Sequence, residues 1–185
     1  MLVLIGKTAT GKDSIKKELL KLGMDSVVTT TTRPMREGEI KDVTYHFIDK
    51  SQFRRLKIQG FFAETTSYDT VHGIWHYGTQ YKDLENNNNK VIILNPYGIK
   101  TFADKLDISK WLIVHVTCPE KTLLERLKSR GDDQKESERR LEADRKDFAN
   151  IERFVDIELL NDGTKTPEEM ARMIKSLYDR HMREN

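Results

Sequence analysis

The chain has 185 residues, a length typical of one domain that can bury a sizeable core. Its 32 lysines and arginines nearly balance its 30 aspartates and glutamates, and the formal net charge of +2 argues against a protein that mainly coats nucleic acid or an acidic membrane surface. Cys118 is the only cysteine, which excludes an intramolecular disulfide and a multi-cysteine zinc site.

The N-terminal residues lack the basic flank of a signal peptide, and every apolar run is far shorter than the roughly 20 residues that span a membrane. We therefore expect a cytoplasmic protein with no membrane partner and no nucleic-acid partner. Both a monomer and a homodimer are compatible with this sequence.

Short apolar runs alternate with helical patterns along the chain. The predicted strands are residues 2–5, 91–94 and 111–116, with a more interrupted candidate at 155–160. The predicted helices are residues 13–22, 51–58, 119–129, 137–154 and 167–182. This alternation predicts right-handed crossovers and an α/β fold with a doubly wound parallel sheet. The segment from about residue 29 breaks the rhythm and predicts a small inserted subdomain over one edge of the sheet.

A glycine-rich loop joins the first predicted strand to the first predicted helix. Residues 6–14 read GKTATGKDS, close to the phosphate-loop (P-loop) pattern GxxxxGK[ST] in the strand–loop–helix context that the motif requires. Gly6 and Gly11 let successive N–H groups point at phosphate oxygens, and Lys12 would reach the β- and γ-phosphates. The residues expected to bind ATP in this segment are Gly6, Thr8, Ala9, Thr10, Gly11, Lys12, Asp13 and Ser14.

One position departs from the phosphate-loop pattern. Asp13 stands where Ser or Thr would normally hold magnesium, and Ser14 follows it. Two interpretations stay open: Asp13 binds Mg²⁺ through water, or Asp13 caps the helix while Ser14 takes over the metal. ATP and Mg²⁺ are thus the expected cofactors, with Asp13 or Ser14 at the metal.

An arginine pair indicates a second phosphate site. Residues 29–39 read TTTTRPMREGE, and YHF follows at 45–47. Arg33 and Arg36, held by Pro34 and bounded by Gly38, can hold one phosphate from two sides with bidentate forks. A solvated basic turn is the alternative for either arginine taken alone.

Together these motifs resemble the guanylate kinase family. TTRPxRxGE followed by YHF is similar to the family's GMP-binding signature, GFFAE at 60–64 resembles its GxFxE, and YGT at 77–79 resembles its YG[ST]. Residues 126–131 and 137–141 resemble its lid, and Asn161-Asp162 resembles its late ND. The resemblance covers nearly the whole chain in the right order.

The resemblance implies a role for each matching residue. Arg33, Arg36, Tyr45 and Tyr77 would hold the acceptor phosphate, whereas Glu64, Thr29 and Thr79 would meet the base edge and Asn161 would join the ATP site. Glu64 would accept hydrogen bonds from guanine N1–H and the 2-amino group, and a buried carboxylate there disfavours adenine, which leaves it unpaired.

The lid would supply positive charge to the migrating phosphoryl group. Phosphoryl transfer needs in-line positioning, exclusion of water and positive charge, so no general base is expected. The catalytic residues expected from the resemblance are Lys12, Arg126, Arg130 and Arg140. We thus expect one P-loop α/β domain with a core at about 1–28, 90–130 and 146–185, an acceptor-nucleotide-binding insert at 29–89 and a helical lid at 131–145.

Two features depart from the family pattern on the acceptor side. The chain carries about four extra residues, most simply placed within 67–74. Asn95 stands where the family usually shows an aspartate that helps recognise the acceptor, and an amide can both donate and accept. Guanine is the first choice of base, but these departures leave an altered base or sugar open.

The expected function is transfer of the ATP γ-phosphoryl group to GMP or dGMP, giving ADP and the diphosphate. The alternative is a related kinase with another or broader acceptor, such as dTMP. A catalytically silent, protein-binding relative is disfavoured because Gly6, Gly11 and Lys12 are all present. A nucleic-acid-binding ATPase is disfavoured by the near-neutral charge and the arginine pair.

Overall fold

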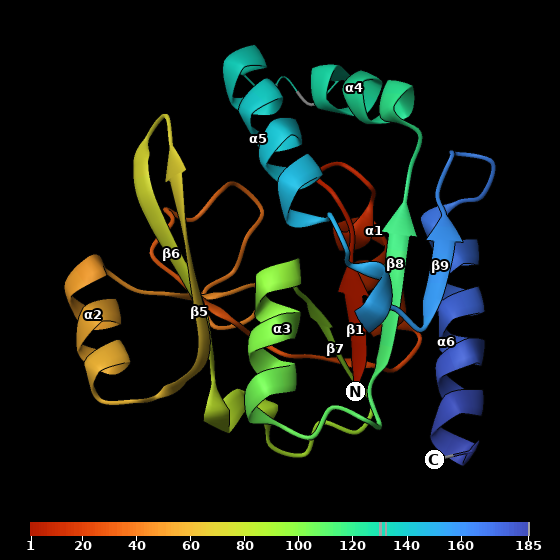
Figure 1. Ribbon diagram of the computed structural model, residues 1–185, viewed down its shortest axis with the longest axis horizontal. Helices are drawn as coiled ribbons and strands as arrows, with labels where there is room; N and C mark the ends of the chain where they lie inside the picture. Colours follow the sequence, from red (N-terminus) through yellow and green to blue (C-terminus); the bar gives the residue numbers. More distant parts are fainter. Residues whose placement is uncertain (130, 132, 185) are drawn as a thin grey trace.

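The computed structural model describes residues 1–129, 131 and 133–184. Two sheets organise the chain (Figure 1): a five-stranded sheet in the order β2–β7–β1–β8–β9 and a four-stranded sheet in the order β4–β3–β6–β5. In the described part of the chain, every helix is too short or too polar to cross a membrane.

The five-stranded sheet is parallel at every pairing and forms the core. Its strands are β1 (Leu2–Ile5), β2 (Asp25–Ser26), β7 (Lys90–Ile93), β8 (Leu112–Thr117) and β9 (Ile157–Leu160). The four predicted strands are confirmed to within two residues at each end. Sequence reasoning missed β2, because two polar residues carry no apolar signal.

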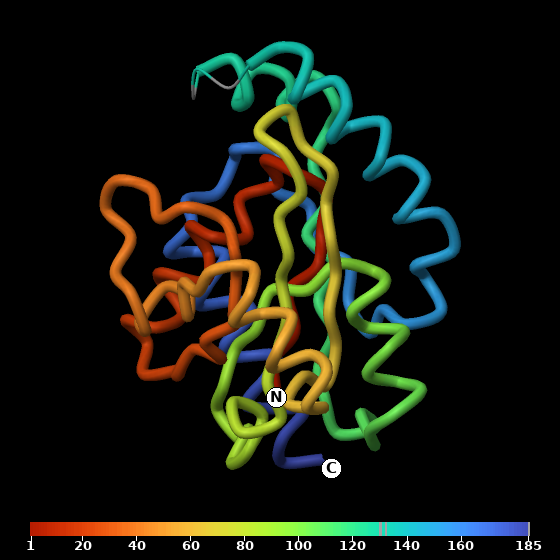
Figure 2. The backbone as a smooth tube through the Cα atoms, turned by 90° about the vertical axis from the view of Figure 1, so that its left-hand side faces the viewer, coloured from red at the N-terminus to blue at the C-terminus, as the bar shows by residue number. Residues whose placement is uncertain are grey.

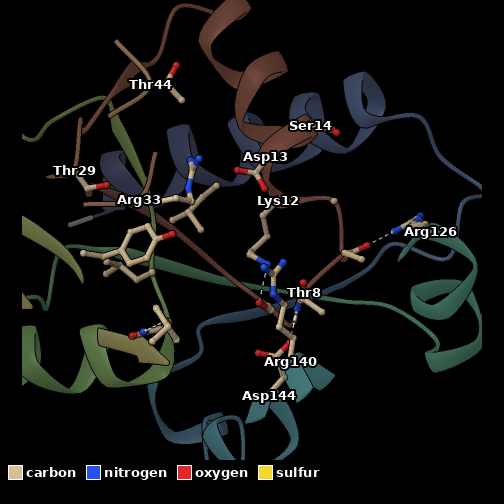
Figure 3. A pocket seen from close by; sticks show the side chains of 18 of the residues that line it. Thr8, Lys12, Asp13, Ser14, Thr29, Arg33, Thr44, Arg126, Arg140 and Asp144 are labelled. Carbon is tan, nitrogen blue, oxygen red and sulfur yellow. Dashed lines mark hydrogen bonds between the residues drawn. The ribbon is translucent and has the colours of Figure 1, made fainter. Parts of the chain in front are cut away.

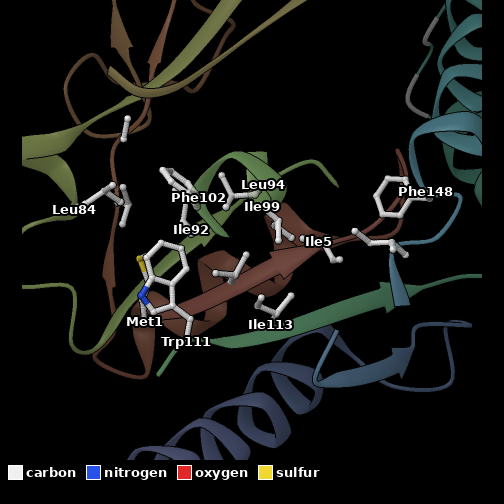
Figure 4. Close-up of a cluster of buried hydrophobic side chains, with 14 residues drawn as sticks. Met1, Ile5, Leu84, Ile92, Leu94, Ile99, Phe102, Trp111, Ile113 and Phe148 are labelled. Carbon is white, nitrogen blue, oxygen red and sulfur yellow. The ribbon is translucent and has the colours of Figure 1, made fainter. Parts of the chain in front are cut away.

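Helices cover both faces of this sheet, as the prediction of a doubly wound fold requires. They are α1 (Lys12–Lys21) and α6 (Pro167–Glu184) on one face and α3 (Pro96–Lys105) on the other. Helices α4 (Glu120–Ser129) and α5 (Gln134–Asp147) lie beyond the carboxyl ends of the strands and pack together in a separate small cluster. Leu2 and Leu4 pack with residues of α1 and α6, whereas Val3 and Ile5 pack with residues of α3 on the other face. Figure 4 shows the buried cluster on the α3 face, in which Phe102 lies beside Trp111.

One helix was missed by the sequence prediction, and the bounds of another need correction. Helix α3 was not predicted; Pro96 lies in its first turn, where the missing N–H costs nothing. The helix predicted at 137–154 begins earlier, at Gln134 after the cap Asp133, and ends at Asp147. Asn150 has a positive φ of 65°, so the helix cannot continue through this residue to the short 3₁₀ turn Glu152–Phe154.

The insert contains the second sheet and one helix. Its elements are β3 (Thr30–Thr31), β4 (His46–Phe47), α2 (Lys50–Ile58), β5 (Phe62–Thr70), β6 (Gly73–Gln80) and the 3₁₀ turn Tyr81–Leu84. The extra residues expected within 67–74 lie in the far half of the β5–β6 hairpin. This hairpin rises to the level of α5 in both Figure 1 and Figure 2, so it forms one wall beside the core.

We predict that Phe102→Ala lowers the free energy of unfolding by about 3–5 kcal/mol, because it removes a fully buried ring from the core. Urea denaturation followed by circular dichroism would measure the loss. Phe61→Ala, at a ring that is 49% exposed, is the matched control and should cost about 1 kcal/mol or less. Equal losses in the two variants would contradict this account of the core.

Candidate active site

A single cavity of about 1170 Å³ is lined by the phosphate loop, the insert and α5. Of the residues predicted from sequence, those that line it are Gly6, Thr8, Ala9, Gly11, Lys12, Asp13, Ser14, Thr29, Arg33, Arg36, Tyr45, Glu64, Tyr77, Thr79, Asn95, Arg126, Arg140 and Asn161. Thr10 is buried instead, and its hydroxyl donates to the Lys7 carbonyl at 2.9 Å. Arg130 lies outside the described residues. The structure therefore brings both predicted nucleotide sites into one cavity (Figure 3).

The phosphate loop is tightly built around its two glycines. A Cβ on Gly6 would meet the Val116 carbonyl oxygen at 2.3 Å, and one on Gly11 would meet Asn161 Nδ2 at 2.5 Å. Asn161 Nδ2 also donates to the Thr10 carbonyl at 2.8 Å. Asn161 thus positions the loop from the end of β9, and its part in binding ATP stays a prediction.

Lys12 lies inside the loop. Its Nζ donates to the carbonyl oxygens of Gly6 and Lys7 at 2.7 Å and to Thr10 Oγ1 at 3.2 Å. Burial lowers the pKa of Lys12 to about 8, because desolvation disfavours the charged amine. Figure 3 shows this side chain curving back toward the loop from the start of α1.

The residues at the start of α1 fit a magnesium ion. Gly11 occupies the N-cap, so Asp13 lies in the first turn and does not cap the helix. Asp13 and Ser14 are both exposed to the cavity and offer oxygen ligands, which Mg²⁺ prefers. Among the described residues no group of three acidic, histidine or cysteine side chains could hold a metal alone. In general, Mg²⁺ keeps several waters and binds through one or two protein oxygens together with substrate phosphates.

A carboxylate from α5 contacts the loop, which sequence reasoning missed. The Thr8 N–H donates to Asp144 Oδ2 at 2.6 Å across a separation of 136 residues. Burial raises the pKa of Asp144, although this hydrogen bond and Lys12 oppose the shift. Asp144 therefore binds one of the loop amides that a phosphate oxygen would need.

The arginines of α4 and α5 are held by protein partners. Arg126 donates to the Ala9 carbonyl and to Asn161 Oδ1, both at 3.2 Å. Arg139 and Arg140 both donate to Glu136, at 2.8–2.9 Å. These hydrogen bonds, with that from Arg139 the largest cause, lower the pKa of Glu136 to about 2. Arg139 also lines the cavity and was not singled out from sequence.

The predicted arginine pair is organised by Glu39. Arg33 is buried and forms a bidentate pair with Glu39 at 2.6 and 3.0 Å, and its guanidinium lies over the Tyr45 ring at 5.5 Å. Glu39 also accepts a hydrogen bond from the Arg36 N–H at 2.7 Å, while the Arg36 side chain is exposed at the cavity. The Tyr45 ring meets Tyr77 edge-on at 6.2 Å. This cluster places positive charge and two phenols at one end of the insert.

Glu64 is a buried residue and not a surface glutamate. It is 7% exposed, and its Oε1 accepts from Thr79 Oγ1 at 2.7 Å while Oε2 accepts from Thr66 Oγ1 at 3.5 Å. Burial raises the pKa of Glu64 above its ordinary value. Each carboxylate oxygen keeps a further lone pair for a ligand, so the site can recognise a pair of hydrogen-bond donors.

The fold, the phosphate loop with its internal lysine, and the facing arginine pair define a P-loop nucleotide kinase. A family model described as guanylate kinase matches residues 1–177. The guanylate kinase of Sulfurimonas denitrificans is 31% identical, over 94% of this chain and 85% of that protein. The guanylate kinase of Nitratidesulfovibrio vulgaris is 34% identical, over 88% of this chain and 79% of that protein. This chain therefore belongs to the guanylate kinase family, and it is an enzyme of the guanylate kinase type.

A solved structure agrees with this assignment at the level of the fold. The crystal structure of guanylate kinase from Anaplasma phagocytophilum has a TM-score of 0.73, 23% identity, and coverage of 98% of this chain and 85% of that chain. The fold class and the enzyme class predicted from sequence are thus confirmed.

We predict that Asp144→Asn tightens ATP binding about three- to tenfold when no acceptor is present. The variant keeps an oxygen that can accept from Thr8 N–H but removes a negative charge that repels phosphate. Isothermal titration with ATP and Mg²⁺ would measure the change. The control is Asp147→Asn, because Asp147 lines the cavity on the same helix and should have a smaller effect. Unchanged or weaker binding in Asp144→Asn would contradict the prediction.

Proposed function

We propose that this protein transfers the γ-phosphoryl group of ATP to GMP or dGMP, giving ADP and GDP or dGDP. One observation carries the proposal: a single cavity is lined by the loop around Lys12 and by the buried carboxylate of Glu64. A nucleotide on each side would bring the two phosphate groups together, and positioning accounts for most of the catalysis of phosphoryl transfer.

On the donor side, the loop N–H groups and Lys12 would bind the ATP phosphates. Asp13 or Ser14 would hold Mg²⁺, which when bound neutralises negative charge on the phosphates. Asn161 and Arg126 keep the loop in its conformation through the hydrogen bonds described above. These residues act by holding positive groups in fixed positions, so little reorganisation is needed during the reaction.

On the acceptor side, Glu64 would read the base. The guanine N1–H and 2-amino groups are two adjacent donors, and they match the two carboxylate oxygens that Thr66 and Thr79 hold in place. Adenine offers no such donor pair and would leave a buried carboxylate unpaired, which is costly. Thr29 lies at the same cavity and would meet another part of the base edge.

The acceptor phosphate would bind beside the cluster that Glu39 organises. Arg33, Arg36, Tyr45 and Tyr77 line this part of the cavity. Glu39 fixes the plane of the Arg33 guanidinium, and Arg36 is exposed and free to turn toward a phosphate. Arg140, with its neighbour Arg139, would add positive charge from the lid, and Arg130 keeps the catalytic role that the resemblance implies. Closure of such a lid excludes water and protects ATP from hydrolysis.

Broader acceptor use is the second candidate function, supported by Asn95 and by the extended β5–β6 hairpin. The predicted cytoplasmic location, the monomeric or homodimeric state, and the lack of membrane and nucleic-acid partners stay predictions.

We predict strong turnover with GMP or dGMP in a coupled ADP-release assay that offers ATP, Mg²⁺ and each nucleoside monophosphate in turn. Lys12→Ala should lower kcat at least 100-fold, because it removes a positive group from the migrating phosphate. Lys100→Ala, at an exposed lysine of α3, is the control and should keep full activity. Turnover with dTMP would overturn the guanine assignment, and no turnover with any acceptor would overturn the proposed kinase.

We predict that the KM for GMP rises as the pH falls, because only the ionised Glu64 can accept from both guanine donors. Since burial raises the pKa of Glu64, the rise should begin at a higher pH than an ordinary glutamate would give. Glu64→Gln should raise this KM about 100-fold at neutral pH and flatten the acid limb of the profile. The phosphate of GMP also titrates, but it does so equally with the unaltered enzyme and with Glu64→Gln. The difference between the two pH profiles of KM therefore reports on Glu64. Parallel profiles would contradict the assignment.

A further inference from the structure

The wall of the acceptor site extends beyond Glu64 along strand β5. Glu64, Thr66, Tyr68 and Thr70 alternate along the strand and all line the cavity. Tyr68 lies opposite Trp75 of β6, which also lines the cavity. Tyr68 belongs to the segment 67–74 that the sequence marks as extended relative to the family, so its role does not come from the family motifs.

Asn95 has only one possible amide orientation. The backbone N–H of Gly98 donates to Asn95 Oδ1 at 2.7 Å, as expected for the N-cap of α3. A backbone N–H can only donate, so the atom facing it must be the amide oxygen. The Nδ2 group therefore points the other way, toward Tyr68 Oη and, at 3.4 Å, Thr66 Oγ1.

This orientation sets the direction of the Tyr68 hydroxyl. Tyr68 Oη accepts a hydrogen from Asn95, so its own hydrogen is available to another acceptor. Among the hydrogen bonds of the described residues, Tyr68 donates none. Burial raises the pKa of Tyr68 to about 12, so the hydroxyl keeps its proton at neutral pH. The ring is positioned by an edge contact with Tyr77, with centroids 5.6 Å apart.

We propose that Tyr68 is a specificity-determining residue of the acceptor site, whose hydroxyl, oriented by Asn95, donates a hydrogen bond to the nucleoside part of the acceptor. The partner would be a ribose oxygen or a purine ring nitrogen. Glu64 offers only acceptors and Tyr68 offers a donor. The wall therefore selects a nucleoside that presents hydrogen-bond donors to Glu64 and an acceptor to Tyr68. The inference rests on the proposed function, because it assumes that the acceptor nucleotide lies against Glu64.

The first test compares Tyr68→Phe with the unaltered enzyme. The variant keeps the ring and its contact with Tyr77 but removes the hydroxyl, so the KM for GMP should rise about 5- to 30-fold. The kcat and the KM for ATP should change less than twofold, which a general loss of structure would not give. Tyr97→Phe is the matched control, because Tyr97 is 59% exposed and outside the cavity.

Two acceptors identify the partner atom. A rise in KM with GMP but not with dGMP would assign the hydrogen bond to the ribose 2′-oxygen. A rise with both would assign it to the base or to another ribose oxygen. An unchanged KM with both acceptors would overturn the inference.

The second test reverses the hydrogen bond between residues 95 and 68. In Asn95→Asp the side chain can still accept from Gly98 N–H, so the cap of α3 is kept, but a carboxylate cannot donate to Tyr68. The Tyr68 hydroxyl would then donate to the carboxylate and lose its hydrogen for the ligand. The KM for GMP should rise as it does in Tyr68→Phe, and the double variant should show no further rise.

A lower KM for GMP in Asn95→Asp, or additive effects in the double variant, would overturn the inference. The proposed function fails separately, through absence of turnover in the unaltered enzyme. In that event titration of GMP by calorimetry gives the same comparison through Kd. A normal Kd in Tyr68→Phe would then contradict the role of the hydroxyl.

Discussion

The active site depends on the parallel pairing of β1 with β7 and β8. Leu4 lies opposite Ile93 and Ile5 opposite His115, so these strands end at one edge of the sheet. The phosphate loop follows β1, and Asn95 follows β7 at the same edge. Asn161 follows β9, and its N–H donates to the Thr117 carbonyl at 2.8 Å. A one-residue slip of β1 would exchange its two buried faces, so the core fixes the register and the register places the loop.

Carboxylates position the positive groups of the cavity. Glu39 holds Arg33, Glu136 holds Arg139 and Arg140, and Asp144 lies at the loop beside Lys12. The pairings of Glu39 and Glu136 fix long arginine side chains that would otherwise lose conformational freedom when phosphate binds, whereas Lys12 is held by the carbonyls of Gly6 and Lys7. The same carboxylates compete with phosphate for these positive groups. The free energy gained when phosphate binds is therefore the difference between the interaction with phosphate and the interaction with the carboxylate. The enzyme thereby gains preorganisation at some cost in affinity.

The sequence predicted those parts of the site in which chemistry and local spacing coincide. Lys12, Arg33 and Glu64 were found because each lies in a short motif whose backbone shape is set by nearby glycine or proline. Asp144 was missed because its contact with Thr8 spans 136 residues, and its neighbours read as the solvated face of a charged helix. Glu136 was also missed, although its partners Arg139 and Arg140 are close in sequence, because its neighbours read as the same solvated face. Local patterns identify such helices but not which of their charges turn inward.

Helix α3 shows how a requirement of the fold can set the chemistry of the site. Its N-cap needs an acceptor for Gly98 N–H, and Asn95 supplies it with the amide oxygen. Only one atom of the amide then faces the cavity wall, and that atom is a donor. The polarity of the Tyr68 hydroxyl follows from this backbone contact. An aspartate would cap the helix equally well but would present an acceptor. At this position the choice between amide and carboxylate therefore changes recognition with little effect on folding.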